Sequence, residues 1–144
     1  GFQVYLCGGP ARLERDLAAD IQRLSRSKPV DLVGQTNLKQ LLALIKEASL
    51  VLAPDTGPTH MATLVGTPVI GLYAHHNPDR TGPYLCRAHA VSVYQELIEQ
   101  ETGKPLAALD WRTRLKDPDA MRKITSERVI AAFDRLCAER QLPG

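Results

Sequence analysis

Short apolar runs alternate with amphipathic segments through the first half of the chain. The runs at 2–7, 30–34, 49–53 and 68–73 are rich in β-branched, leucine and aromatic residues and are bounded by glycine, proline or polar residues. This pattern is typical of buried strands. The four runs therefore predict four strands that are apolar on both faces.

The segments between these runs have helical spacing. From Ala11 onward, Leu13, Leu17, Ile21 and Leu24 recur on one helical face. Asn37 is placed to cap a second helix, whose apolar residues are Leu38, Leu41, Leu42 and Ile45. A third helix is predicted over 58–65, with Pro58 in its first turn and Gly66 at its end. Strands and helices in strict alternation predict an α/β fold, a Rossmann-like parallel sheet with helices on both faces.

The pattern changes after Tyr73. Residues 74–89 form a long polar stretch, and long loops in compact domains are often functional. A helix ended by Gly103 follows, and then an irregular or short-helical stretch. Ser126 is predicted to cap a last helix. Its apolar face would comprise Val129, Ile130, Phe133, Leu136 and Cys137.

Composition narrows the class of protein. The 18 basic and 16 acidic residues nearly cancel, which disfavours a dedicated nucleic-acid surface. Cys7 and Cys137 lie in apolar contexts and are expected to be buried, and three dispersed cysteines fit a reducing compartment. No apolar run has the length of a membrane span and no signal peptide is recognisable. Because the chain opens almost directly on a strand, we expect it to be a piece of a longer protein.

The stretch "PDTGPTH" stands at the carboxyl end of the third predicted strand, where open parallel sheets bind ligands. Thr56 and Gly57 precede a helix whose first N–H groups lack internal partners, so they are candidates to seat a diphosphate. Asp55 would repel phosphate and is expected to face N–H groups or sugar hydroxyls. The alternative is that Asp55 or Thr56 only caps the helix.

His60 and the stretch "CGGPARLE" are further candidates for a ligand site at the end of a strand. His60 lies in the first turn of the helix and could point to the same edge, although a structural role is the ordinary one for such a histidine. In "CGGPARLE", Gly8 and Gly9 would let a ligand approach the backbone and Glu14 could reach a ribose. A tight turn that needs glycine explains this stretch equally well.

The 74–89 stretch contains His75, His76, Cys86 and His89, which raises the question of a metal. It has neither CxxC nor HExxH, and the four well-aimed ligands of a zinc site are not legible, so a metal is disfavoured. Arg80 is the better candidate, as a cation for phosphate, against the alternative of a solvated surface arginine.

These residues in this order resemble glycosyltransferase family 9, the ADP-heptose:lipopolysaccharide heptosyltransferases. The resemblance rests on three segments: "CGGP", "NLKQLLALIKEASLVLAPDTGPTHMATLVGTPVIGLY" and "NPDRTGPY". They span about residues 4 to 84, and the last sixty residues are similar only in a terminal helix.

The resemblance implies a GT-B enzyme in which this chain, residues 1–144, is the C-terminal domain for the nucleotide-sugar donor. By motif, Thr56 and Gly57 would contact the donor diphosphate, and Asp55 and His60 would face the sugar side. The family places an acidic residue soon after "GGP", near the ribose. Here Arg12 occupies that slot and Glu14 follows.

The implied reaction is an inverting transfer of heptose from ADP-heptose to a lipopolysaccharide core precursor. The catalytic base would lie in an N-terminal domain that also binds the lipid-linked acceptor and is absent from this chain, so the chain alone is expected to be inactive. No metal or cofactor is implied. The setting would be cytoplasmic, with room for peripheral association with the inner membrane.

Three alternatives differ from this interpretation. One is the same family with another nucleotide sugar. The second is a non-catalytic nucleotide-binding module with a similar α/β sheet. The third, a dinucleotide oxidoreductase domain, is disfavoured because no GxGxxG follows any predicted strand.

Overall fold

The computed structural model describes residues 1–142, in two compact units formed by residues 1–44 and 45–142. Strands and helices alternate as predicted through the fourth strand, and every strand pair is parallel. This confirms the α/β fold class. The strands form two sheets, one in each unit, and each unit is described by itself.

The first unit contains β1 (Tyr5–Leu6), α1 (Arg12–Leu24) and β2 (Val30–Asp31). Both strands are shorter than predicted, and they pair in parallel with Tyr5 opposite Val30. Helix α2 (Leu38–Glu47) begins in this unit and continues into the second. Asn37 caps it as predicted: its Oδ1 accepts from the Gln40 N–H at 2.9 Å, and Gln40 Oε1 accepts from the Asn37 N–H. This reciprocal pair satisfies two donors at the helix start.

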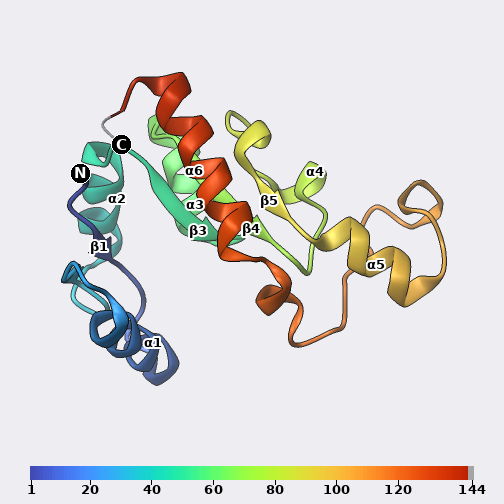
Figure 1. The fold of residues 1–144 in the computed structure, drawn as a ribbon, viewed down its shortest axis with the longest axis horizontal. Coiled ribbons are helices and arrows are strands. Elements are labelled where there is room, and N and C mark those ends of the chain that lie inside the picture. Colours follow the sequence, from blue (N-terminus) through green and yellow to red (C-terminus); the bar gives the residue numbers. More distant parts are fainter. Residues whose placement is uncertain (143–144) are drawn as a thin grey trace. The chain divides into compact units, whose positions relative to one another are not determined.

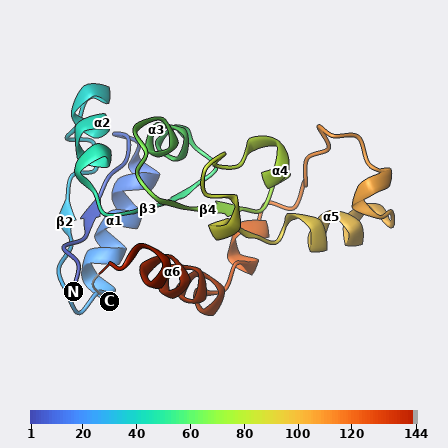
Figure 2. The same cartoon turned by 90° about the horizontal axis from the view of Figure 1, so that it is seen from above.

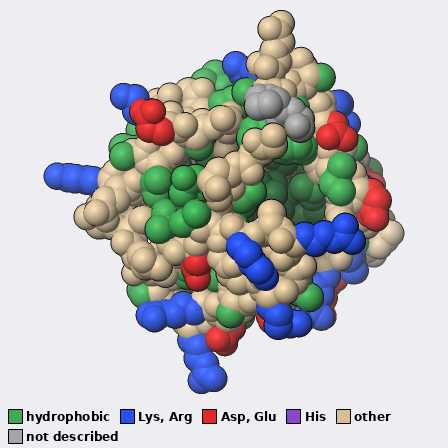
Figure 3. Space-filling model, turned by 60° about the vertical axis from the view of Figure 1, so that its left-hand side comes forward, with side chains coloured by type: hydrophobic (Ala, Val, Ile, Leu, Met, Phe, Trp, Pro, Cys, Tyr) green, Lys and Arg blue, Asp and Glu red, His purple; other side chains and the backbone are tan. Residues whose placement is uncertain are grey.

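The apolar stripe of α1 is exposed. The four side chains that define it are between 43% and 72% exposed, and Ala18 is the one buried residue of this helix. Figure 3 shows apolar side chains at the surface on one face of the molecule, with lysine and arginine side chains among them. The expectation that Cys7 is buried was wrong, because this cysteine follows the end of the two-residue β1 and lies exposed. Cys137 is buried as expected.

The second unit contains a sheet with the strand order β3-β4-β5: β3 (Val51–Pro54), β4 (Val69–Tyr73) and β5 (Val91–Ser92). Helix α3 (Gly57–Val65) lies on one face of this sheet and α6 (Ser126–Arg140) on the other (Figures 1 and 2). Gly66 ends α3 in the left-handed conformation, as predicted. Strand β5 was not predicted, since two residues give no periodicity to detect.

The stretch 74–89 is more ordered than a loop. It contains the one-turn helix α4 (Pro78–Thr81) and the 3₁₀ turn η1 (Arg87–His89). Gly82 ends α4 so tightly that a Cβ there would meet the Pro78 carbonyl oxygen. Asn77 begins it, accepting from the Asp79 N–H at 2.9 Å. The ends of α4 are therefore well defined.

The remaining elements follow the predicted order. Helix α5 (Tyr94–Thr102) ends at Gly103 as predicted, and the irregular stretch holds two 3₁₀ turns, η2 (Leu106–Ala108) and η3 (Ala120–Lys123). The cap of α6 is Thr125 and not Ser126, because the Thr125 hydroxyl is the group that accepts from the Arg128 N–H.

Two apolar clusters stabilise the second unit. One joins the sheet to α6 through Ile70, Val91, Ala132 and Leu136. The other joins α5 to the segments around it through Val93, Tyr94, Leu97, Ile98 and Leu115, among others. Within residues 1–142, no helix is both long and apolar enough to span a bilayer.

Candidate functional site

The strands of the second unit end at a common edge. Pro54 lies opposite Leu72, and Tyr73 lies opposite Ser92. Since the strands are parallel, Asp55 after β3 and the histidine pair after β4 emerge at this same carboxyl edge. Such edges are where open α/β sheets place their ligands.

The turn between β3 and α3 is fixed by two threonine hydroxyls. Thr59 is fully buried and donates to the Pro54 carbonyl at 2.7 Å, and Thr56 donates to the same carbonyl at 3.3 Å. Thr56 is the N-cap residue of α3 by backbone geometry but makes no side-chain cap hydrogen bond. Thr56 thus occupies the cap position that the alternative predicted, but without a side-chain cap hydrogen bond.

The Asp55 carboxylate is held by other partners. Its Oδ2 accepts from the Thr81 hydroxyl at 2.9 Å and lies 3.4 Å from His76 Nδ1, while its Oδ1 lies 4.0 Å from His60 Nε2. The side chain of Asp55 is 19% exposed, that of His76 33% and that of His60 59%. We call Asp55, His60, His76 and Thr81 the Asp55 cluster. Its members come from the turn after β3, from α3, from the segment after β4 and from α4.

Gly57, the first residue of α3, faces open space. A Cβ built at this position has no atom within 4 Å. A ligand could therefore approach the backbone at the start of α3, where unpaired N–H groups and the positive end of the helix dipole favour an anion. The structure thus leaves room at the position where Thr56 and Gly57 were predicted to meet a diphosphate.

Tyr73, the last residue of β4, is buried with its hydroxyl unpartnered among the described residues. Its ring folds back over Gly71, where an added Cβ would lie within 3 Å of the ring and the hydroxyl. Burial, with a smaller contribution from the negative charge of Asp55, raises the pKa of Tyr73 well above its usual range. The phenol therefore remains neutral beside the Asp55 cluster at physiological pH.

We expect Tyr73→Phe to stabilise the protein by about 1 kcal/mol, because an unsatisfied buried hydroxyl costs about that much or more. The neutral phenol is favoured in the fold, so the folded chain retains a proton that the unfolded chain loses near pH 10. The wild type should then lose stability as the pH rises above about 10, and Tyr73→Phe should lose less. Urea unfolding at pH 7.5 and pH 10.5 measures both. A less stable Tyr73→Phe at pH 7.5 would mean that the hydroxyl has a bound partner.

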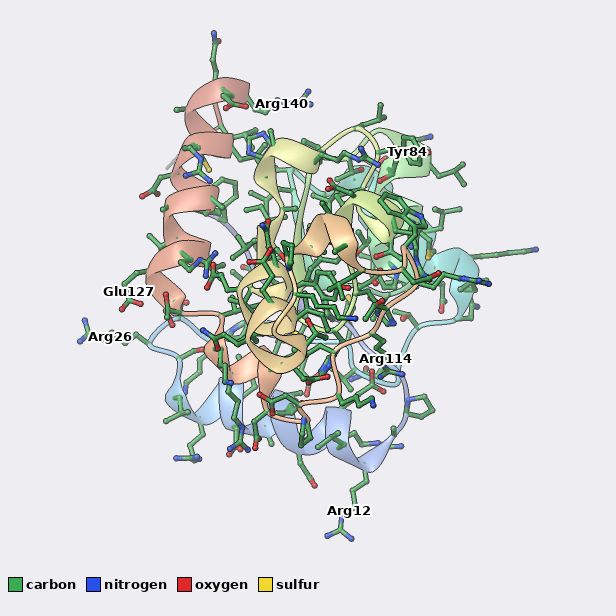
Figure 4. All side chains as sticks on the ribbon, turned by 90° about the vertical axis from the view of Figure 1, so that its right-hand side faces the viewer. Arg12, Arg26, Tyr84, Arg114, Glu127 and Arg140 are labelled. Carbon is green, nitrogen blue, oxygen red and sulfur yellow. The ribbon has the colours of Figure 1, made fainter. Side chains whose placement is uncertain are left out.

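The first unit brings Gly8, Gly9 and Glu14 together. The Glu14 carboxylate lies over the glycine turn: a Cβ on Gly9 would come within 2.8 Å of Glu14 Oε2, and one on Gly8 within 3.3 Å of Oε1. Arg12 points away from α1 toward solvent (Figure 4), 3.7 Å from the exposed Asp16 carboxylate. Glu14, and not Arg12, therefore lies at this turn, where Arg15 also donates to the Pro10 carbonyl at 3.0 Å. These residues and the Asp55 cluster belong to different units.

Arg80 lies exposed on α4, next to Thr81. Burial raises the pKa of Tyr94, and the positive charge of Arg80 partly opposes this effect. Beyond α4, Arg87 stacks on the ring of Tyr84, which lies on the outer surface in Figure 4. Arg80, which was predicted to contact phosphate, is thus solvent-accessible and lies on the same helix as Thr81 of the Asp55 cluster.

The other ligand-type side chains of 74–89 have separate partners. His75 Nδ1 lies 3.3 Å from the Leu115 carbonyl oxygen, and the buried Cys86 sulfur accepts from the Val69 N–H. His89 is buried, with Nε2 2.9 Å from Glu139 on α6 and Nδ1 unpartnered among the described residues. Across residues 1–142, no group of three or more such side chains is arranged to hold a metal ion.

Sequence reasoning missed two members of the Asp55 cluster. Thr81 is 26 residues from Asp55 and belongs to a helix too short to be predicted, and His76 had no assigned role. The quoted segment "NPDRTGPY" contains Thr81, but nothing in its letters indicates the Asp55 contact. A separate cavity of about 280 Å³ is lined by Asn77 and the first two residues of α4 on one side and by residues of α5.

Comparison with known proteins gives a consistent result. The family model described as glycosyltransferase family 9 (heptosyltransferase) matches residues 1–110. The chain is 48% identical over 135 residues to lipopolysaccharide core heptosyltransferase OpsX of Haemophilus influenzae, covering 94% of this chain and 39% of that protein. This chain thus spans about two fifths of the length of that curated relative.

Two solved structures are similar in fold. One is a glycosyl transferase family 9 protein from Veillonella parvula, with a TM-score of 0.72 and 24% identity, covering 96% of this chain and 37% of that chain. The other is E. coli ADP-heptose lps heptosyltransferase II, with a TM-score of 0.68 and 21% identity, covering 98% of this chain and 38% of that chain. The alignments with both structures extend over nearly all of this chain.

Proposed function

The chain belongs to glycosyltransferase family 9, the heptosyltransferases, and we propose on that basis that it is the donor-binding part of an enzyme that builds the lipopolysaccharide core. The donor would be ADP-heptose and the acceptor a lipid-linked core precursor. The observation that carries the proposal is the orientation of Asp55. Its carboxylate accepts from Thr81 and lies 4.0 Å from His60, where a sugar would lie, while the backbone at Gly57 stays open to an anion.

The four residues of the motif, Asp55, Thr56, Gly57 and His60, would contact different parts of the donor because of their charges. The diphosphate would sit at the start of α3, against the backbone of Thr56 and Gly57, where the helix dipole favours negative charge. The Thr56 hydroxyl, which donates to the Pro54 carbonyl, could turn to a phosphate oxygen. Asp55 and His60 would then meet the hydroxyls of the heptose, because a second anion beside the diphosphate would repel it.

The remaining predicted residues lie in different units, and each is assigned a role by itself. Glu14, above the turn at Gly8 and Gly9, would accept hydrogen bonds from the ribose hydroxyls, which a carboxylate does well. Arg80 is exposed and could move to the diphosphate, where a guanidinium binds two oxygens at once. With the helix end and Arg80, the leaving nucleotide has two sources of positive charge in this chain.

The chemical step would be an inverting displacement. A carboxylate base would take the proton of the acceptor hydroxyl, which attacks the anomeric carbon as the diphosphate leaves. We place the base and the acceptor site in an N-terminal domain outside this chain, and the enzyme at the cytoplasmic side of the inner membrane. On this proposal, the isolated chain does not turn over.

Calorimetric titration tests the donor assignment. The full-length protein is titrated with ADP-heptose, ADP, UDP and GDP. We expect ADP-heptose and ADP to bind and the other two nucleotides to bind at least about tenfold more weakly, since a base-specific site loses hydrogen bonds with the wrong base. Preference for UDP or GDP would replace ADP-heptose by another nucleotide sugar. Binding of ADP without any turnover of ADP-heptose by the full-length protein would favour a non-catalytic module.

A further inference from the structure

The two oxygens of the Asp55 carboxylate have different surroundings. Oδ2 is engaged by Thr81 at 2.9 Å and by His76 at 3.4 Å. Oδ1 has His60 Nε2 as its neighbour at 4.0 Å, which is too long for a hydrogen bond. One side of the carboxylate is therefore held by the protein, and the other is open toward the more exposed histidine.

Thr81 is built to hold Oδ2. Its hydroxyl lies 2.9 Å from Asp55 Oδ2 and 3.3 Å from the Asn77 carbonyl, and it has a single proton to donate. The hydroxyl donates to Asp55 Oδ2, because this contact is shorter and its acceptor is charged. Because both ends of α4 are fixed, by Asn77 and by Gly82, the hydroxyl is presented from a defined position.

His76 approaches the same oxygen from the segment after β4. Its neighbour His75 faces the Leu115 carbonyl instead, so the two consecutive histidines have unrelated partners. At 3.4 Å and one-third exposure, the His76 contact is looser than that of Thr81. It still brings the imidazole to Oδ2 from a second direction, where a protonated ring would form an ion pair and restrict rotation of the carboxylate.

The gap between Asp55 Oδ1 and His60 Nε2 has the size for one hydroxyl group. Hydrogen bonds of about 2.7 Å to oxygen and about 2.9 Å to nitrogen can both reach a single oxygen atom placed beside a 4.0 Å line. That hydroxyl would donate to the carboxylate and accept from the imidazole N–H. A phosphate oxygen has no proton to donate and would be repelled by Asp55, so the geometry selects a sugar hydroxyl.

We propose that Thr81 and His76 are positioning residues that fix Asp55 through Oδ2, so that Oδ1 and His60 together recognise one hydroxyl of the donor sugar. This inference rests on the proposed function, since it assumes that the ligand at this edge is a nucleotide sugar. Thr81 and His76 thereby act on the sugar and not on the nucleotide. Thr81 and His76 should accordingly distinguish ADP-heptose from ADP.

The test compares the affinities of the full-length protein for ADP-heptose and for ADP by calorimetry. We expect Thr81→Val to weaken ADP-heptose binding about tenfold or more and to leave ADP binding within about twofold, because a lost hydrogen bond to a charged group has an effect of that size. Thr81→Ser, which keeps the hydroxyl, should restore it. His76→Leu should give a smaller loss of the same kind, and His76→Asn, whose amide N–H can replace Nδ1–H, should recover part of it.

Two controls sharpen the comparison. His75→Leu should leave both affinities unchanged, since His75 does not face Asp55. In an Asp55→Ala background, Thr81→Val should have no further effect, because the two residues act through one contact.

The outcomes separate this inference from the proposed function. If Thr81→Val binds ADP-heptose like the wild type, or loses ADP and ADP-heptose equally with a lower melting temperature, Thr81 is not a positioning residue for the sugar. If the wild type binds neither ligand, both the proposed function and this inference are wrong. Loss confined to ADP-heptose supports both.

Discussion

Replacing Asp55 with asparagine should lower kcat/KM of the full-length protein with ADP-heptose about a hundredfold while leaving the fold intact. The amide has nearly the same shape and its oxygen can still accept from Thr81, so the turn after β3 keeps its main contact. What is lost is the negative charge and the acceptor at the Oδ1 position. An interaction with the sugar that strengthens as the diphosphate leaves affects the transition state by several kcal/mol.

The matched control is Asp79→Asn, the same chemical change on the neighbouring helix α4. Asp79 contacts Asn77 and Arg87 through backbone atoms, so this change should leave turnover near the wild-type value. Initial rates with a lipopolysaccharide core acceptor and melting temperatures decide the matter. If Asp55→Asn turns over like the wild type, the "PDTGPTH" stretch serves the fold only.

Gly57→Val should weaken ADP binding about tenfold or more without reducing stability. A Cβ at this position meets no atom of the protein within 4 Å, so the fold can accept a side chain there. The new methyl groups would instead occupy the space over the start of α3 that the diphosphate needs. Gly57→Ala should give a weaker effect in the same direction, with equal or slightly higher stability, since alanine suits a helix better than glycine does.

Gly103→Ala is the converse control. Gly103 ends α5 with a φ of 68°, where a side chain costs about 1 kcal/mol, and it is not part of the proposed site. We expect this variant to lose stability in urea unfolding and to keep its ADP affinity. Equal ADP affinity in Gly57→Val and the wild type would move the diphosphate away from α3.

The sequence predicts the parts of this fold in which one segment determines its own structure. The alternation of strands and helices, the Asn37 cap, and the ends of α3 and α5 at Gly66 and Gly103 follow from local periodicity and backbone geometry. Strand β5 was missed because Val91 and Ser92 become a strand only by pairing with β4. The same applies to α4, whose single turn is fixed by contacts at its ends.

The candidate site likewise contains residues that the sequence predicts and contacts that it does not. Asp55, Thr56, Gly57 and His60 could be proposed from a short motif at the end of a strand. The contact of Asp55 with Thr81 could not, because it depends on the path of the chain after β4. Helix α1 shows a different limit of sequence analysis. Leu13 and Leu24 have the spacing of a buried helical face, but both side chains are exposed, because spacing does not identify the surface that would cover them.

The pair formed by His89 and Glu139 sets a practical limit on how far the chain can be shortened. Glu139 lies next to the last residue of α6, and its side chain is largely exposed, so it looks dispensable. Yet its carboxylate lies 2.9 Å from Nε2 of a buried imidazole whose other nitrogen has no partner in the described part of the chain. A protein ending at Ala138 would retain the apolar contacts of α6 with the sheet and leave that imidazole stranded. Work on a trimmed version should therefore keep the chain through Arg140.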